Sequence, residues 1–128
     1  MLKKPSKKRK VNKTSLTKRL DAAWSLEVKR RAGYRCEVCG KRNNLNSHHI
    51  VGRRNRNLRW DLRNGVCLCV SHHKFGLQSF HEDPLWAREW LEENRWEDYA
   101  YLYTVKEEIK KWSIEEMKEL LQVLTSKE

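Results

Sequence analysis

The sequence contains no run of 18 apolar residues, and no apolar segment follows its basic N-terminus. The first absence argues against a membrane-spanning helix, and the second argues against a secretory signal. Internal repeats are also absent. A chain of 128 residues with these properties normally forms one small domain. We expect an intracellular protein, either in the cytoplasm of a bacterial or phage-infected cell or in the nucleus if the source is eukaryotic.

Acidic residues are missing from the first 20 positions, which carry nine lysines and arginines. The net charge of +11 is divided into +9 in residues 1–20, +8 in residues 21–80 and −6 in residues 81–128. Such a field attracts a phosphate backbone, so we expect DNA as the partner. No amphipathic lipid-binding segment accompanies the basic residues, so a membrane is not expected. The acidic C-terminal helices should repel DNA and act as a lid or a docking element for a protein partner or a second copy.

Residues 1–20 hold almost no side chains that could join a core, and we expect a basic, disordered arm there. Within it, residues 7–11 are also similar to a nuclear import signal. Basic clusters match such signals often by chance, so we favour an arm that holds DNA electrostatically.

The four cysteines are spaced for metal binding rather than for disulfides. Cys36 and Cys39 form one pair, and Cys69 and His72 form a second pair with the same spacing, which is typical of a closed structural zinc site. Cys67 is an alternative ligand, because residues two apart in a strand face the same side. We favour a buried thiol at that position.

Hydrophobic spacing predicts an α+β protein. We expect a short helix over residues 22–32 that ends at Gly33, strands over residues 45–51 and 65–70, and a helix that begins at His72 behind a Ser71 cap. Strand, loop, strand and helix in this order form a ββα unit.

The last third is predicted to be helical. Asp83 and Pro84 mark a helix start. The capping-box patterns of residues 104–107 and 113–116 mark two more. The final helix carries an apolar stripe made of Ile114, Met117, Leu120, Leu121 and Leu124.

Four pieces of residues 24–82 together resemble the zinc-supported branch of the HNH nuclease family. They are residues 33–40 (GYRCEVCG), residues 48–50 (HHI), residues 62–66 (LRNGV) and residues 68–74 (LCVSHHK). Each piece is weak alone, but their order and register make the resemblance specific. It implies a ββα-metal core over residues 21–82, stapled by a structural zinc, with a helical extension over residues 83–128. The family usually has Cys where His72 stands.

The resemblance also implies roles for the remaining polar residues. His49 matches the general base, and Asn64 matches the residue that orients the base or pins the loop. His48 and His73 match ligands of a catalytic divalent ion, expected to be Mg²⁺, Mn²⁺ or a similar ion. His81 is either a third ligand or a surface or capping residue. Neighbouring residues in a strand face opposite ways, so His48 and His49 cannot share one role.

The loop over residues 52–63 is rich in arginine. Arg53, Arg54, Arg56 and Lys74 are candidate DNA contacts. Trp60 either stacks on a base or joins the core. Together these features predict a metal-dependent HNH DNA endonuclease, and the family resemblance implies that it leaves 3′-hydroxyl and 5′-phosphate ends. The alternative is a zinc-stabilised DNA-binding module without activity.

Overall fold

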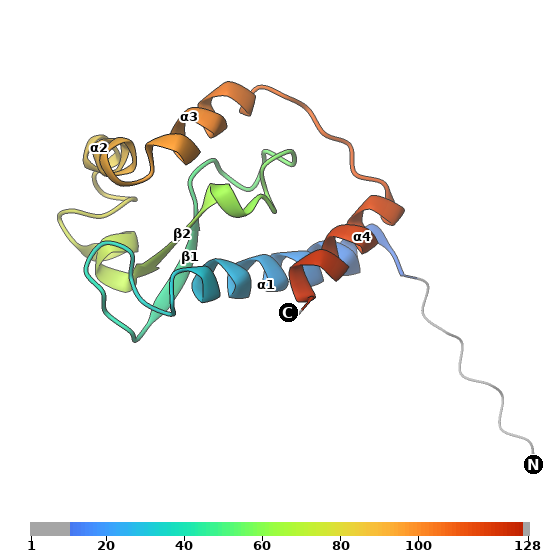
Figure 1. Ribbon diagram of the computed structural model, residues 1–128, viewed down its shortest axis with the longest axis horizontal. Helices are drawn as coiled ribbons and strands as arrows, with labels where there is room; N and C mark the ends of the chain where they lie inside the picture. Colours follow the sequence, from blue (N-terminus) through green and yellow to red (C-terminus); the bar gives the residue numbers. More distant parts are fainter. Residues whose placement is uncertain (1–10, 127–128) are drawn as a thin grey trace, which may run out of the picture.

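The computed structural model describes residues 11–126, which form helices around one small antiparallel sheet (Figure 1). The elements are α1 (Lys13–Arg31), β1 (Leu45–His49), the 3₁₀ turn η1 (Leu62–Asn64), β2 (Gly65–Cys69), the π-helical turn η2 (Ser71–Phe75), α2 (Pro84–Asn94), α3 (Trp96–Val105) and α4 (Ile114–Thr125). The predicted α+β class is confirmed. Every helix in this part of the chain is too short or too polar to span a lipid bilayer.

Helix α1 begins nine residues earlier than the sequence predicts. The Asn12 side chain caps it by accepting a hydrogen bond from the backbone N–H of Ser15 at 2.8 Å. Residues 13–20 are therefore helical, and the prediction of a disordered arm over residues 1–20 is wrong for them, because Leu16 and Leu20 are buried in the core. Residues 1–10, with most of the import-like run, lie outside the described residues.

The end of α1 follows the prediction. Gly33 has a φ of +70°, which glycine adopts at low cost. Its N–H donates to the carbonyl of Arg30, and the N–H of Tyr34 donates to that of Lys29. These paired bonds satisfy carbonyls that a helix end leaves without partners.

Strands β1 and β2 pair in a register that joins Leu45 to Cys69 and His49 to Gly65. Helix α1 crosses the sheet so closely that a Cβ on Gly65 would lie 2.4 Å from Cγ2 of Val28. Any larger residue would force the helix away from the strand. Gly65 therefore lets α1 approach the start of β2.

The core has two parts, and both use C-terminal helices. One cluster joins α1 to α4 through Leu20, Trp24, Met117 and Leu121. The other joins β2 to the region around α2 and includes Val66, Leu68, Phe80, Ala87 and Leu91. The apolar stripe predicted on the last helix is confirmed, and α4 lies along α1 (Figure 1). Because its apolar face is buried there, α4 is a core element, and the prediction of a lid is wrong for it.

Local capping predictions have mixed outcomes. Asp83 caps α2, with Pro84 in its first turn, and Ser113 forms a reciprocal capping box with Glu116, as predicted. The predicted box at Thr104 is wrong, because Thr104 lies inside α3 and its hydroxyl donates to the carbonyl of Ala100. The predicted helix behind Ser71 is only the single turn η2, which Ser71 does not cap.

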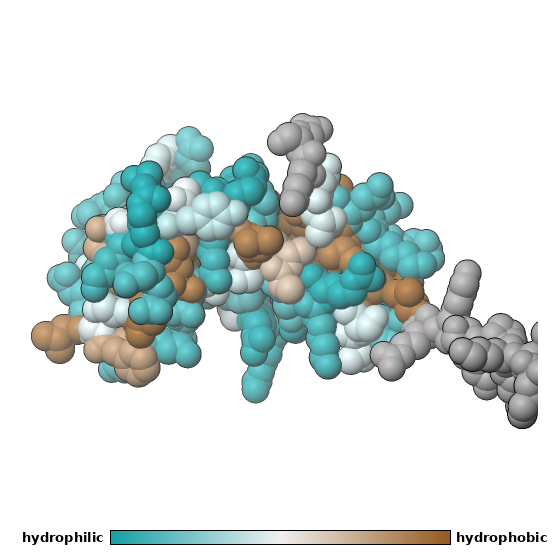
Figure 2. Space-filling model, turned by 90° about the horizontal axis from the view of Figure 1, so that it is seen from below, coloured by the Kyte–Doolittle hydropathy of each residue, from teal (hydrophilic) through white to brown (hydrophobic). Residues whose placement is uncertain are grey.

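The face that includes α1 and α4 is mostly hydrophilic, with smaller hydrophobic patches between hydrophilic side chains (Figure 2). Leu26 and Val123 are among its exposed apolar residues. This surface is compatible with a chain whose charged fraction is 35%.

Candidate functional site

Cys36, Cys39, Cys69 and His72 converge, as their spacing predicts, and form a group that can hold a metal ion such as zinc. Their candidate ligand atoms all lie within 4.8 Å of one another. The sulfurs of Cys39 and Cys69 are 3.7 Å apart, and Nδ1 of His72 lies 3.3 Å from the sulfur of Cys69 and 3.9 Å from that of Cys36. Bonds of about 2.3 Å to sulfur and 2.1 Å to nitrogen give tetrahedral edges of roughly 3.6 to 3.8 Å, and the three separations lie within about 0.3 Å of these values.

The backbone around Cys36 favours the thiolate form of its side chain. Burial alone would raise the pKa of Cys36, but the backbone N–H groups of Cys69, Cys39 and Val38 point at its sulfur and bring its pKa below the ordinary value. Burial lowers the pKa of His72, which keeps its imidazole neutral. Both states are the ones that bind a metal.

Cys67 does not belong to this group. All four cysteines are free of disulfides, but Cys67 is fully buried in the cluster that contains Trp24. Burial raises the pKa of Cys67 to about 11, which disfavours the thiolate that a metal needs. The favoured interpretation of a buried thiol fits this placement.

His48, His73 and His81 form a second group that can hold a metal, with candidate ligand nitrogens also within 4.8 Å of one another. The Nε2 atoms of His73 and His81 are 3.1 Å apart, close to the separation of two nitrogens bound to one ion at about 2.1 Å. Burial, followed by the neighbouring histidines, lowers the pKa of His48 to about 3, and burial lowers that of His73 to about 4. Neutral imidazoles that cannot easily take up a proton are good metal ligands.

The chain reaches this arrangement because the turn η2 stops early. The N–H of Gly76 donates to the carbonyl of Ser71, and the chain then folds back. The N–H of His81 donates to the carbonyl of His73 at 3.1 Å. The structure therefore brings His81 to His73, which the sequence left open.

His49 does not belong to this group: it packs on the opposite side of β1 from His48, as strand alternation predicts, although both reach the same cleft. Its ring stacks on Trp24, and its Nε2 lies 2.8 Å from the carbonyl oxygen of Arg59. A carbonyl can only accept, so Nε2 carries the proton and Nδ1 of the neutral ring is left as a proton acceptor. Burial lowers the pKa of His49, which favours that neutral ring.

Arg59, whose carbonyl accepts from His49, is held through its side chain by a residue that sequence analysis missed. Asp21 of α1 accepts two hydrogen bonds from the Arg59 guanidinium at 2.9 and 2.7 Å and one from Nε1 of Trp60 at 2.8 Å. No motif or local spacing marks Asp21, because its partners lie 38 and 39 residues away. Trp60 is buried, so the prediction that it stacks on a base is not supported and its core role is confirmed.

Asn64 is fully buried and pins the arginine-rich loop. Its Oδ1 accepts from the N–H of Val51, and its Nδ2 donates to the carbonyls of Val51 and Leu58. The loop-pinning role fits these contacts, whereas no hydrogen bond joins Asn64 to His49 in the described part of the chain.

One open cleft of about 470 Å³ contains both the three histidines of the second metal group and His49. It is lined by His48, His49, His73 and His81 together with Arg53 and Lys74. Arg54 and Arg56 are exposed and line a neighbouring hollow that shares Arg53. Basic side chains therefore border the histidines on the side of the loop.

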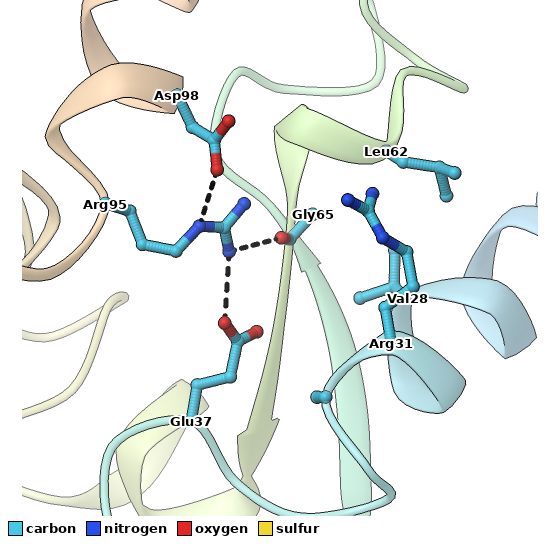
Figure 3. Close-up of a pocket in the computed structure, with 8 residues that line it drawn as sticks. Val28, Arg31, Glu37, Leu62, Gly65, Arg95 and Asp98 are labelled. Atoms are coloured by element: carbon cyan, nitrogen blue, oxygen red, sulfur yellow. Dashed lines mark hydrogen bonds and ion pairs between the residues drawn. The ribbon is translucent and has the colours of Figure 1, made fainter.

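Arg95, between α2 and α3, is a second residue that sequence analysis missed. Its guanidinium donates to Glu37, to Asp98 and to the carbonyl of Gly65, and Figure 3 shows these groups converging on it. It also donates to the carbonyl of Arg63 at 3.3 Å. The two carbonyls flank Asn64, so Arg95 joins the C-terminal helices to the residue that pins the loop.

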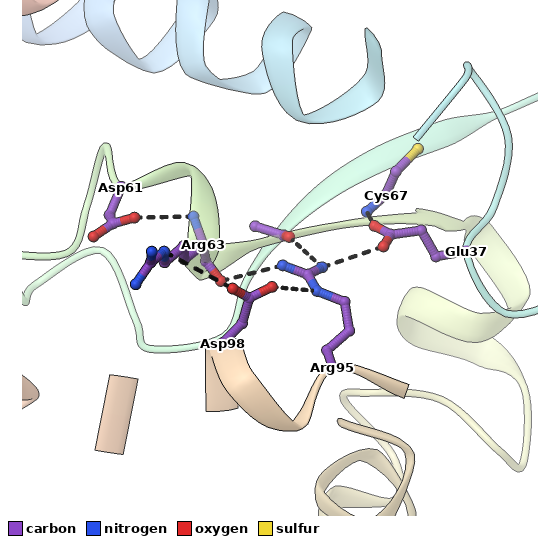
Figure 4. A network of polar contacts seen from close by, with 7 residues as sticks. Glu37, Asp61, Arg63, Cys67, Arg95 and Asp98 are labelled. Carbon is purple, nitrogen blue, oxygen red and sulfur yellow. Dashed lines mark hydrogen bonds and ion pairs between the residues drawn. The ribbon is translucent and has the colours of Figure 1, made fainter. Parts of the chain in front are cut away.

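Glu37 completes this network from within the cysteine turn. Its second carboxylate oxygen accepts from the N–H of Cys67 at 2.7 Å (Figure 4). The network therefore links the cysteine turn to β2 and to α3.

No protein-family model matches this chain, and no curated protein or solved structure matches it either.

Proposed function

We propose that this protein is a divalent-metal-dependent endonuclease that hydrolyses phosphodiester bonds in DNA, with a ββα-metal core of the HNH type. One observation carries the proposal: two kinds of histidine line a single basic cleft. His48, His73 and His81 form a set of candidate metal ligands, and the fourth, His49, has Nδ1 available as a proton acceptor. Metal ligands, a base and cationic side chains are the parts that phosphodiester hydrolysis needs.

His49 acts as the general base. Its Nε2–H donates to the Arg59 carbonyl, so Nδ1 can take a proton from the attacking water. The Trp24 ring limits rotation of the imidazole. Arg53 and Lys74 bind phosphate oxygens at the edge of the cleft.

His48, His73 and His81 hold the divalent ion, which when bound neutralises charge on the phosphate and stabilises the departing 3′ oxygen. Imidazole ligands suit Mn²⁺ or a softer ion better than Mg²⁺, which prefers oxygen. The cysteine group holds a separate, structural zinc through Cys36, Cys39, Cys69 and His72.

The rival function is a zinc-stabilised DNA-binding module without activity. Such a module would require the cysteine group for its fold and the basic loop for DNA binding. It does not require three converging, neutral imidazoles beside His49, a fourth imidazole whose Nδ1 can accept a proton. This arrangement favours the enzyme.

The test is incubation of purified protein with supercoiled plasmid in Mg²⁺, in Mn²⁺ and in EDTA. We expect conversion to nicked or linear DNA with a divalent ion and none with EDTA. His49→Gln should abolish cutting, because glutamine can donate to the Arg59 carbonyl but cannot act as a base. His49→Gln should retain DNA binding.

Two controls make the result decisive. His49→Gln purified by the same route excludes a contaminating nuclease, and circular dichroism melting shows whether it folds. Cutting by folded His49→Gln would remove His49 from the mechanism. Intact DNA with every ion tested, together with normal gel-shift binding, would support the binding module.

A further inference from the structure

A second basic surface lies between the N-terminal half of α1 and the segment that precedes α4. We call it the basic groove. It has a volume of about 590 Å³ and is lined by Lys13, Lys18, Arg56, Lys110, Lys111 and Trp112, among others. The C-terminal third of the chain, which is acidic as a whole, therefore contributes two lysines to a basic surface.

The basic groove continues from the histidine cleft. Arg56 and Arg59 line both the groove and the hollow of the arginine-rich loop. Gly52 and Arg53 line both that hollow and the histidine cleft. Basic side chains thus line a path from the cleft, across the loop, to the start of α1.

Specific contacts fasten the segment before α4 to the loop. Nε1 of Trp112 donates to the carbonyl of Arg56 at 2.8 Å. Nδ2 of Asn55 donates to the carbonyl of Lys106 at 2.8 Å, and the rings of Trp60 and Trp112 meet edge to face at 5.4 Å. This attachment places Lys110 and Lys111 beside Arg56.

Most of the cations in the groove lack an acidic partner. Lys110 pairs with Glu116, but within residues 11–126 no ion pair involves Lys13, Lys18 or Lys111. These three lysines are exposed. The acidic residue in the groove, Asp21, is neutralised by Arg59. The groove therefore presents uncompensated positive charge in a concave surface.

We propose that the basic groove binds the phosphate backbone of duplex DNA that flanks the cleavage site, on the side of the arginine-rich loop. The proposal rests on the proposed nuclease function for the position of the cut, but the binding itself does not need catalysis. Flexible lysines contact phosphates rather than base edges, so the groove adds affinity without sequence preference. With the groove, the protein contacts a longer stretch of the DNA backbone than it does through the cleft alone.

The first test measures DNA binding with the zinc-containing His49→Gln protein and no added divalent ion, so that cleavage plays no part and the structural zinc is kept. The groove variant carries Lys13→Gln, Lys18→Gln and Lys111→Gln in that background. The control variant carries Arg35→Gln, Lys41→Gln and Arg42→Gln, which are exposed positions around the cysteine turn and lose the same charge. Affinity for a duplex of random sequence is measured across a range of salt concentrations.

We expect the groove variant to bind at least tenfold more weakly near 0.1 M salt. Its slope of log affinity against log salt should be smaller by about 2 to 3, since each lost phosphate contact removes about 0.9. The control variant should keep the slope of the parent. Equal losses in both variants would show an effect of net charge alone and would overturn the proposal, as would an unchanged slope in the groove variant.

A second readout separates this proposal from the nuclease proposal. In the protein with His49 intact, the groove substitutions should raise KM for plasmid and leave kcat at saturating DNA unchanged. A protein that cuts nothing but loses duplex binding through the groove would refute the nuclease and keep the groove. Loss of binding to duplex RNA, with duplex DNA unaffected, would overturn DNA as the partner.

Discussion

The imidazole of His49 lies flat against the indole of Trp24, with ring centroids 3.8 Å apart and planes 10° from parallel. Trp24 is itself buried, and its Nε1 donates to the carbonyl of Asp61 at 2.9 Å. Helix α1 therefore supports the proposed base from one side while the Arg59 carbonyl fixes its Nε2.

Replacing Trp24 should separate support of His49 from simple loss of stability. Trp24→Phe keeps an aromatic face but loses volume and one hydrogen bond, so we expect a cost of about 1 to 3 kcal/mol in unfolding free energy. Plasmid cutting by the folded protein should stay within a few-fold. Trp24→Leu should lower kcat further, because the imidazole loses its stacking partner. Equal kcat for the two folded variants would show that stacking does not position His49.

Loss of one cysteine ligand should remove metal and stability together. We expect Cys36→Ser to bind less zinc and to melt at a lower temperature, because metal binding contributes directly to folding free energy. Zinc content by elemental analysis and melting by circular dichroism provide the measurement.

Cys67→Ala is the matched control, because it removes a buried thiol outside the metal group. We expect it to keep the full zinc content and to lose only about 1 kcal/mol of stability. Zinc loss from this variant, with normal zinc in Cys36→Ser, would exchange the assignments of the two cysteines.

Replacing Asp21 by Asn should destabilise the protein in a pH-dependent manner. Burial alone would raise the pKa of Asp21, but hydrogen bonds from Arg59 and Trp60 outweigh burial and hold the pKa below its usual value of 3.8. A depressed pKa means that the carboxylate stabilises the fold above pH of about 4 and loses this effect as pH falls through the folded-state pKa. Asp21→Asn should therefore melt below wild type at pH 7, with a gap that narrows below about pH 4. A gap that is constant with pH would exclude the charge of Asp21 as its source.

Arg95 should contribute far more stability than an exposed arginine. Its side chain is 17% exposed and joins Glu37, Asp98 and the two carbonyls beside Asn64. We expect Arg95→Ala to lower the unfolding free energy by about 1 to 3 kcal/mol, since each of these acceptors loses its hydrogen bond from the guanidinium. Arg88→Ala, which breaks an exposed pair with Glu92, should leave the unfolding free energy nearly unchanged, because water and salt screen that pair. Similar losses in urea denaturation for both variants would refute the bridging role.

Features that depend on a few neighbouring residues were predictable. The cap at Asp83, the box of Ser113 and Glu116 and the turn at Gly33 involve groups three to five positions apart. The same local signals fail at Thr104. A capping-box sequence permits a helix to start but does not require it, and α3 continues through this position. The start of α1 was missed for the opposite reason. Its lysines argue for disorder, but Leu16 and Leu20 gain a partner in α4, more than 90 residues away along the chain.

The sequence by itself determined the cysteine group, because each pair of its ligands lies only three residues apart along the chain. It also determined that His48 and His49 face opposite ways, because successive side chains in a strand point to opposite sides. Only the tertiary structure decided that His81 joins His73, that Asp21 binds the guanidinium of Arg59, and that Lys111 lies beside Arg56. The physical reason is distance along the chain: each of these contacts depends on how whole elements pack, and no local pattern encodes that packing.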